Sequence, residues 1–259
     1  MKVAIIGTGN VAHVLGRKIL QCEHQIVQVA GRNRSDAEQL GLLLRAASTD
    51  SFQDITCDAD IYIVAVSDAA LTEAHWWLPR LVKGIVVHTA GAVSKKVLCR
   101  IAEKYGVLYP LQSLRSHITD LPEIPLIIDG DSHETLNHIR AFAASLSGMV
   151  READDETRLK IHTGAVIANN FSNYLFTLVQ DFCVNENLDF SLLMPLIKET
   201  VGRLEHHPAS ILQTGPAIRN DELTIAVHLD ILKKYPELKA LYGTLTEQII
   251  RHYHRHENR

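Results

Sequence analysis

Short apolar runs and helix-like stretches alternate through the first half of the chain. The runs lie at residues 3–6, 26–30, 61–66, 85–87 and 107–109, and the helix-like stretches lie at 10–21, 35–45, 69–82 and 94–104. Strands that are apolar on both faces are typical of a parallel sheet covered by helices on both sides. The pattern therefore predicts an α/β fold with a doubly wound parallel sheet.

The sequence changes character after residue 152. An apolar run at 126–128, a helix-like stretch at 132–146 and a short strand near 148–151 complete the first pattern. From Asp154 onward the apolar residues follow helical spacing, first over 171–182 and then near 190–204, 221–234 and 236–254. We predict a doubly wound domain over residues 1–152 and an all-α domain over 153–259, which ends in a solvated helix end at 251–256.

Composition narrows the class of protein further. The chain has 259 residues, of which 46% are hydrophobic, and its formal net charge is −4, which gives no basic face for nucleic acid. The four cysteines have no metal-ligand spacing, the first apolar run is too short for a signal peptide, and no run reaches the ~18 residues of a membrane span. We expect a cytoplasmic protein without nucleic-acid or membrane partners. Its 14 histidines are the one unusual count.

A glycine turn joins the first predicted strand to the first helix. It reads Gly7-Thr8-Gly9-Asn10-Val11-Ala12, with the GxGxxA spacing of a dinucleotide-binding turn. The first glycine permits the tight turn, the second lets a pyrophosphate approach the backbone, and the alanine lets the helix pack closely on the strand. The free N–H groups at the start of the helix would bind the phosphates.

The end of the second strand indicates which dinucleotide binds. NAD enzymes usually place an acidic residue there for the ribose hydroxyls, whereas this chain has Gly31-Arg32-Asn33-Arg34-Ser35. Two guanidinium groups and a hydroxyl suit the 2′-phosphate of NADP, so NADP is favoured over NAD. The alternative is that Arg32 and Arg34 are solvated loop charges.

Two further segments follow strand ends and should line the nicotinamide half of the site. They are Val66-Ser67-Asp68 and His88-Thr89-Ala90-Gly91. Ser67 could equally cap the helix that begins near Ala69.

These motifs together resemble a known family. They occur in one order with Tyr109-Pro110-Leu111-Gln112-Ser113, His162, Asn169-Asn170 and Thr214-Gly215-Pro216-Ala217-Ile218-Arg219-Asn220-Asp221. The chain resembles the Rossmann-like NADP oxidoreductases that carry a C-terminal helical domain of unknown function. That family is similar to pyrroline-5-carboxylate reductase, ketopantoate reductase and the deazaflavin-dependent NADP oxidoreductases.

The resemblance implies a homodimer with a small-molecule substrate bound between the Rossmann domain and the helices. In related hydroxyacid dehydrogenases a catalytic lysine precedes the Asn-Asn pair by three residues, but this chain has Val166 there. The resemblance therefore does not imply a lysine-assisted alcohol oxidation for this chain.

Two histidines are candidates for proton transfer, because the unperturbed pKa of histidine lies near neutrality. His162 shares a helix face with Asn169, next to Asn170, whereas His88 directly follows a parallel strand. We weigh the two histidines equally, and a buried, structural His162 is the alternative reading. Gln112 and Ser113 could hold a substrate carbonyl or imine.

Arg219 is the candidate anchor for a substrate carboxylate, because it lies in a turn that enters a helix. An internal ion pair with Asp221 would explain the same residues. A metal site is not favoured, because Glu205, His206, His207 and His228 match no ligand spacing.

The sequence therefore predicts an NADP-dependent oxidoreductase that acts on a small carbonyl, imine or hydroxyacid-like substrate. The alternative is a non-catalytic NADP(H) sensor or a partner-binding protein.

Overall fold

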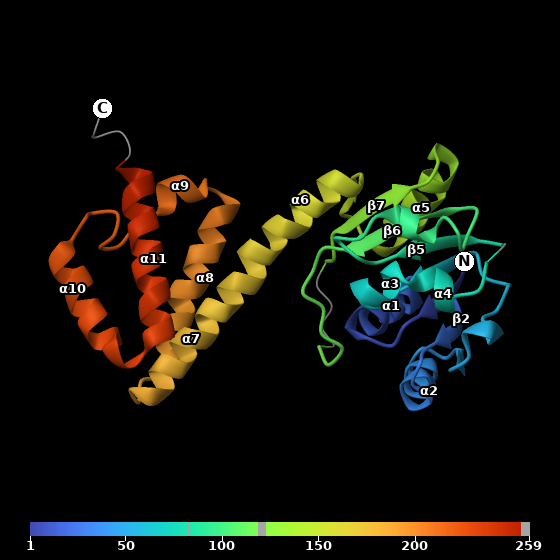
Figure 1. Ribbon diagram of the computed structural model, residues 1–259, viewed down its shortest axis with the longest axis horizontal. Helices are drawn as coiled ribbons and strands as arrows, with labels where there is room; N and C mark the ends of the chain where they lie inside the picture. Colours follow the sequence, from blue (N-terminus) through green and yellow to red (C-terminus); the bar gives the residue numbers. More distant parts are fainter. Residues whose placement is uncertain (82, 119–122, 255–259) are drawn as a thin grey trace. The chain divides into compact units, whose positions relative to one another are not determined.

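The computed structural model describes residues 1–81, 83–118 and 123–254, which form two compact units, Met1–Asn169 and Asn170–Arg259 (Figure 1). The strands of the first unit are β1 (Lys2–Ile6), β2 (Gln25–Ala30), β3 (Ala47–Thr49), β4 (Ile61–Val64), β5 (Ile85–His88), β6 (Tyr105–Pro110), β7 (Leu126–Gly130) and β8 (Val150–Glu152). Its helices are α1 (Asn10–Gln21), α2 (Arg34–Leu43), α3 (Asp68–Thr72), α4 (Ala74–Trp77), α5 (His133–Leu146) and α6 (Asp155–Ala165).

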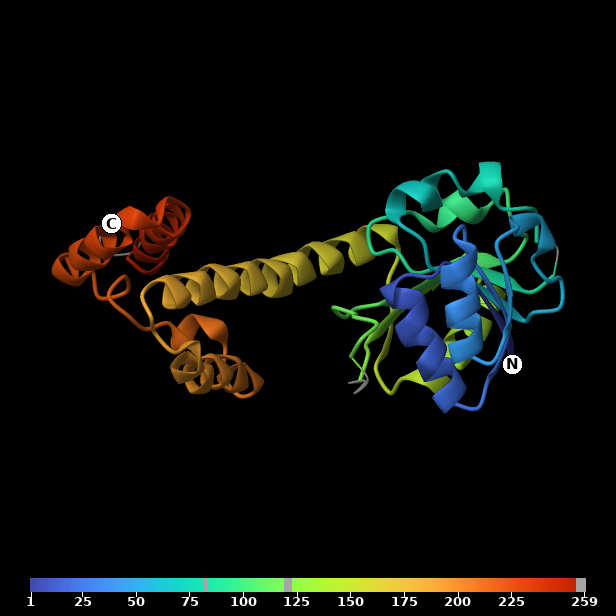
Figure 2. The same cartoon turned by 90° about the horizontal axis from the view of Figure 1, so that it is seen from below.

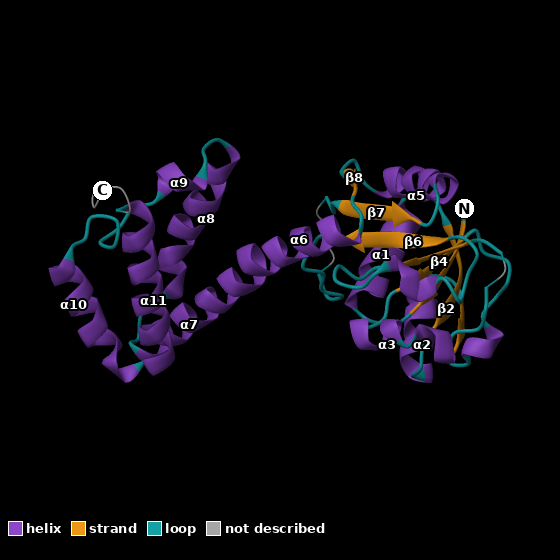
Figure 3. Ribbon diagram, turned by 45° about the horizontal axis from the view of Figure 1, so that its top comes forward, coloured by secondary structure: helices purple, strands orange, loops and turns teal. Residues whose placement is uncertain are grey.

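The eight strands form one sheet in the order β3-β2-β1-β4-β5-β6-β7-β8 (Figure 3). All neighbouring pairs are parallel except β6 and β7, which are antiparallel. The strand order reverses between β1 and β4, and ligands of doubly wound sheets bind outside the carboxyl ends of the strands at such a point. The predicted fold class, a Rossmann domain followed by helices, is confirmed.

Side chains that alternate along β1 supply two separate cores. Val3 and Ile5 pack with residues of α1, α2 and α5 on one face, whereas Ala4 and Ile6 pack with residues of α3 and α4 on the other. Figure 2 shows α1 and α2 on one side of the first unit and the α3–α4 segment on the opposite side. Because both faces are covered, the central strands are apolar throughout, as predicted.

The helix predicted over 69–82 is shorter and is divided into α3 and α4. Glu73 leaves helical geometry between the two. Leu78 is extended with ψ 125° because the ring of Pro79 disfavours helical geometry in the residue before it.

The helix predicted over 94–104 is wrong. Only one 3-10 turn forms, η2 (Lys95–Leu98). The backbone N–H of Leu81 donates to the Ile101 carbonyl at 2.7 Å, and Leu81 pairs with Ala102 as an isolated parallel bridge. This pairing takes the chain out of helical geometry before β6 begins.

The first turn of α6 is fixed to the segment after β5. Asp155 accepts hydrogen bonds from the Ser94 hydroxyl and the Lys95 backbone N–H, and Arg158 donates to the Val93 carbonyl at 2.6 Å. The compact unit therefore extends to Asn169, beyond residue 152. The predicted division at residue 152 into two domains stays a prediction.

The second unit consists of helices. They are α7 (Ser172–Asn185), α8 (Met194–Gly202), α9 (Ala209–Leu212), α10 (Glu222–Ile231) and α11 (Pro236–Tyr253), and a π-helical segment, Val166–Phe171, precedes α7. No helix in the described part of the chain is both long enough and apolar enough to cross a membrane.

The predicted solvated helix end is right for part of the C-terminal segment. Arg251 and His252 are exposed, but Nε2 of the half-buried His254 lies 2.8 Å from the Ile218 carbonyl oxygen and ties α11 to the turn before α10. Arg255 and His256 lie outside the described residues.

Candidate functional site

The glycine turn has the predicted position between β1 and α1. Gly7 has φ +122°, and a Cβ there would lie 2.1 Å from the Ala65 carbonyl oxygen. A Cβ on Gly9 would meet nothing within 4 Å, so the space beside this glycine is open to a ligand. A Cβ on Gly31 would lie 2.5 Å from the Thr8 methyl group, so the turn and the end of β2 approach closely. The backbone therefore approaches itself closely at Gly7 and Gly31 and leaves open space beside Gly9 at the start of α1.

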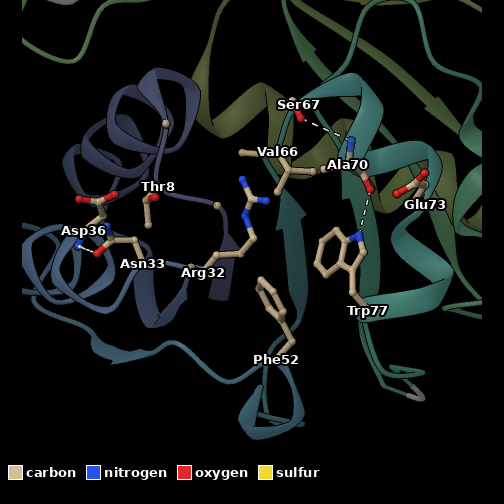
Figure 4. A pocket seen from close by; sticks show the side chains of 14 residues that line it. Thr8, Arg32, Asn33, Asp36, Phe52, Val66, Ser67, Ala70, Glu73 and Trp77 are labelled. Atoms are coloured by element: carbon tan, nitrogen blue, oxygen red, sulfur yellow. Dashed lines mark hydrogen bonds between the residues drawn. The ribbon is translucent and has the colours of Figure 1, made fainter.

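A cleft of about 690 Å³ opens beside this turn at the carboxyl ends of β1, β2 and β4 (Figure 4). It is lined by Gly7, Thr8, Gly9, Gly31, Arg32, Asn33, Asp36, Phe52, Ala65, Val66, Ser67, Ala70, Glu73 and Trp77. The predicted cofactor contacts Asn10, Val11 and Ala12 lie on α1, where the Asn10 side chain accepts a hydrogen bond from the Ser116 N–H and the other two pack toward the core.

Arg32 and Arg34 have different surroundings. The guanidinium group of Arg32 points into the cleft, and it makes no hydrogen bond or ion pair with the residues that the structure describes (Figure 4). Arg34 lies outside this cleft, and its Nε is 2.8 Å from the Glu38 carboxylate. Asn33 caps α2 by accepting from the Asp36 N–H, and the Ser35 hydroxyl accepts from Gln39. Arg32 is thus the cation available to an anion in the cleft.

Phe52 and Trp77 also line the cleft, and the sequence motifs did not predict them. The Phe52 and Trp77 rings lie 4.7 Å apart, and Nε1 of Trp77 donates to the Ala70 carbonyl at 3.0 Å. No local motif marks them, because they come from segments 25 residues apart in sequence. Ser67 caps α3 by accepting from the Ala70 N–H, as its alternative reading predicted, and it also lines the cleft.

His88 lies inside the protein. Its exposed fraction is 0%, and its Nδ1 accepts a hydrogen bond from the Ala90 N–H at 3.2 Å. Burial first and the positive charge of Arg158 second lower the pKa of His88 to about 3, so the ring is neutral at physiological pH. This environment disfavours His88 as a proton donor to a substrate.

His162 lies at the surface of the same region. The ring is half-buried, and its Nδ1 lies 2.9 Å from the Tyr109 hydroxyl oxygen. A Cβ on Gly91, which follows β5, would lie 2.6 Å from the same nitrogen. Burial first and the negative charge of Asp68 second raise the pKa of the Tyr109 hydroxyl. The segment after β5 and the end of β6 therefore both lie against the His162 ring.

Several other predicted substrate contacts are exposed side chains. Asn169 and Asn170 are exposed in the π-helical segment, and the division between the two compact units falls between them. Gln112 and Ser113 are exposed too, and the Gln112 side chain accepts from the Ser113 N–H.

Arg219 is exposed in the second unit, in the turn before α10. Asp221 accepts from the backbone and hydroxyl of Thr224, and these bonds, together with the weaker effect of the Arg219 charge, lower its pKa. No Arg219–Asp221 ion pair forms in the described part of the chain. Within the described ranges no three His, Cys, Asp or Glu side chains are grouped to hold a metal ion.

Comparison with known proteins identifies the family. Residues 2–90 match the family described as NADP oxidoreductase, coenzyme F420-dependent, and residues 124–249 match a domain of unknown function, DUF2520. The crystal structure of a Bacteroides fragilis protein assigned as an NADP oxidoreductase is 33% identical, with a TM-score of 0.90 over 96% of this chain and 98% of that chain. The chain belongs to the NADP oxidoreductase family.

More distant structures share the fold of this NADP oxidoreductase. An imine reductase from Myxococcus stipitatus, solved with NADP+, is 15% identical with a TM-score of 0.62 over 96% of this chain and 93% of that one. A 1-pyrroline-5-carboxylate reductase from Streptococcus pyogenes is 14% identical with a TM-score of 0.60 over 96% of this chain and 98% of that one. The predicted family resemblance is confirmed. A comparison with curated proteins gave no match.

Proposed function

We propose that this NADP oxidoreductase transfers a hydride between NADP(H) and a small carbonyl, imine or hydroxyacid-like substrate. The observation that carries the proposal is the cleft beside the glycine turn, into which Arg32 points without an ion-pair partner in the described part of the chain. NADPH, when bound, supplies the hydride, and the protein supplies orientation and a proton.

The residues of the cleft fit the chemical groups of NADP. The backbone of Gly7 and Gly9 and the first turn of α1 would hold the pyrophosphate, because Gly9 leaves open space there. Arg32 would bind the 2′-phosphate, since its guanidinium group offers several charged donors. Phe52 and Trp77 would give the adenine an apolar, aromatic wall.

Within the substrate range we favour a C=N group. Asp68 is the exposed first residue of α3, and the pKa of the Tyr109 hydroxyl is raised by burial first and by the negative charge of Asp68 second. A negative charge at this position attracts a cationic iminium group and repels a keto acid. The imine reductase and the pyrroline carboxylate reductase with this fold support the same class.

The proton would come from His162. Its ring is half-buried and lies within hydrogen-bond distance of the Tyr109 hydroxyl, whereas His88 is enclosed. Asn169, Asn170 and Arg219 remain predicted substrate contacts, of which Arg219 would bind a substrate carboxylate. We assign the protein to the cytoplasm, which the four cysteines free of disulfides support.

The second unit supports a homodimer. Among its described residues the buried apolar side chains are Cys183, Ala217 and Leu232. The exposed large apolar ones are Phe171, Tyr174, Phe176, Val184, Leu188, Leu192, Met194, Leu196, Val201, Leu204, Ile211, Leu223, Val227, Ile231 and Leu245. So small a core does not stabilise a domain of this size, whereas the same unit of a second copy would cover the apolar faces.

A substitution in α10 tests the dimer. Leu223, Val227 and Ile231 are spaced four residues apart and form an exposed apolar stripe. We expect Val227→Glu to convert a dimer into a monomer in light scattering. The control is Leu42→Glu, at an 84% exposed leucine of the first unit, which should leave the mass unchanged. A monomeric wild-type protein would contradict the proposal.

Fluorescence titration with NADPH and NADH tests the cofactor site. The chain has two tryptophans, Trp77 in the cleft and Trp76, which is 80% exposed. We expect NADPH to quench wild-type and Trp76→Phe fluorescence, and Trp77→Phe to lose most of the quenching. Equal quenching in both variants would contradict this placement of the cofactor.

Turnover is then tested with cyclic imines, keto acids and hydroxy acids by the change in NADPH absorbance. We expect the imines to be reduced fastest. Tight NADPH binding without turnover of any of these classes would refute the enzyme assignment and favour the sensor function.

A further inference from the structure

Gly91, Tyr109 and His162 meet at the carboxyl ends of β5 and β6. Nδ1 of His162 lies 2.9 Å from the Tyr109 hydroxyl oxygen, and the two rings are in edge contact at 5.8 Å between centroids. We propose that Tyr109 is a positioning residue whose hydroxyl holds Nδ1 of His162, so that Nε2 is the nitrogen that gives the proton to the substrate. This inference rests on the proposed function.

The hydrogen bond with Tyr109 distinguishes the two ring nitrogens of His162. It is the hydrogen bond that the His162 ring makes within the described ranges, and it uses Nδ1. Nε2 therefore has no protein partner there and remains available to a substrate. Burial, followed by the charge of Asp68, raises the pKa of Tyr109, so its hydroxyl stays neutral and forms no ion pair with the ring.

Gly91 provides the space in which the two rings meet. A Cβ at this position would lie 2.6 Å from Nδ1 of His162 and 2.9 Å from Cζ of Tyr109. Gly91 does not have a positive φ, so its backbone conformation is open to alanine. The contact with the two rings, and not the backbone, is therefore what excludes a side chain here.

The helix that carries His162 is held in register by an ion pair. Asp155, Arg158 and His162 are spaced so that they share one face of α6. Arg158 is 1% exposed, pairs with Asp155 at 2.7 Å and donates to the Val93 carbonyl, and Asp155 also binds Ser94. These bonds therefore hold this face of α6 against the segment after β5, which also contains Gly91.

The proton step in the reduction direction is simple. In the cationic ring both nitrogens carry hydrogen, and Nδ1–H donates to the Tyr109 oxygen. The N–H bond at Nε2 breaks and its proton bonds to the nitrogen of a neutral imine, which becomes a cationic iminium. This iminium is the acceptor of the hydride that bound NADPH would supply. His162 is left neutral with its Nδ1 bond intact, the substrate is released as an amine, and solvent returns a proton to Nε2.

Three variants test the pair. Tyr109→Phe removes the hydroxyl, Gly91→Ala separates the rings, and Tyr105→Phe is the control at the other end of β6. The first readout is the ¹⁵N NMR resonance of His162 Nδ1, assigned by its loss in His162→Gln. We expect it to shift in Tyr109→Phe and Gly91→Ala and to stay in place in Tyr105→Phe.

The second readout is the rate of NADPH oxidation with a reducible imine as a function of pH. We expect Tyr109→Phe and Gly91→Ala to lower this rate about 10- to 100-fold and to change its pH profile, and we expect Tyr109→Phe to bind NADPH with the affinity of the wild type. An unmoved resonance or an unchanged rate and profile in Tyr109→Phe would overturn the proposal. Failure of the wild type to bind NADPH would instead refute the proposed function.

Discussion

Replacement of Arg32 by alanine should convert a selective NADPH site into one with little preference. Arg32 points into the cleft and makes no ion pair in the described part of the chain, so its full charge is available to the 2′-phosphate. A hydrogen bond to a charged group contributes about 1.5 to 3 kcal/mol. We therefore expect the NADPH Kd to rise about 10- to 100-fold, and the NADH Kd to change less than about threefold.

Arg34→Ala is the matched control for this variant. In the wild type, Nε of Arg34 lies 2.8 Å from the Glu38 carboxylate, and the Arg34 side chain is 76% exposed and does not line the cleft. Titration of both variants with NADPH and NADH, followed by Trp77 fluorescence, measures the change in selectivity. Equal losses of NADPH affinity in the two variants, or an unchanged affinity in Arg32→Ala, would refute the assignment of the 2′-phosphate to Arg32.

Three other predictions concern buried and charged groups. The pKa of His88 is about 3 in the folded protein, so between about pH 6.5 and pH 3 only the unfolded chain protonates this histidine, and the free energy of unfolding should fall by about 1.4 kcal/mol for each pH unit. Urea unfolding at pH 7.5 and pH 5 should show a smaller loss of stability in His88→Asn than in the wild type. Asp155→Ala should lower the free energy of unfolding by about 2 to 3 kcal/mol, because it removes the carboxylate that pairs with the buried Arg158. Asp154→Ala removes only a helix cap and should cause a smaller loss in the same assay. Asp68→Asn should raise the KM for a cationic iminium about threefold to fivefold and leave that for a neutral ketone unchanged, and an equal effect on both would contradict the electrostatic argument.

Some elements of the fold could be predicted because their signals are local. The apolar runs of β1, β4 and β5 are buried on both faces, and the GxGxxA turn lies between a strand and a helix as its spacing requires. The segment over 94–104 misled the prediction, because its apolar spacing is helical while its backbone pairs with Leu81. A partner distant in sequence decided that conformation.

The candidate site shows the same limit. The sequence indicated NADP from the two arginines after β2, but it could not show that Arg32 points into the cleft while Arg34 pairs with Glu38. The sequence did not distinguish His88 from His162 as the proton donor, because residue type alone does not show whether a side chain is buried. The structure encloses His88 and leaves His162 half-buried.

The sequence by itself determined the alternation of strands and helices, the glycine turn and the class of cofactor, because the signal for each lies in residues a few positions apart. Only the tertiary structure brought Trp77 to Phe52 and Tyr109 to His162. Those contacts join segments from different strands and helices, and they form only when the sheet order and the packing of each helix place the side chains together.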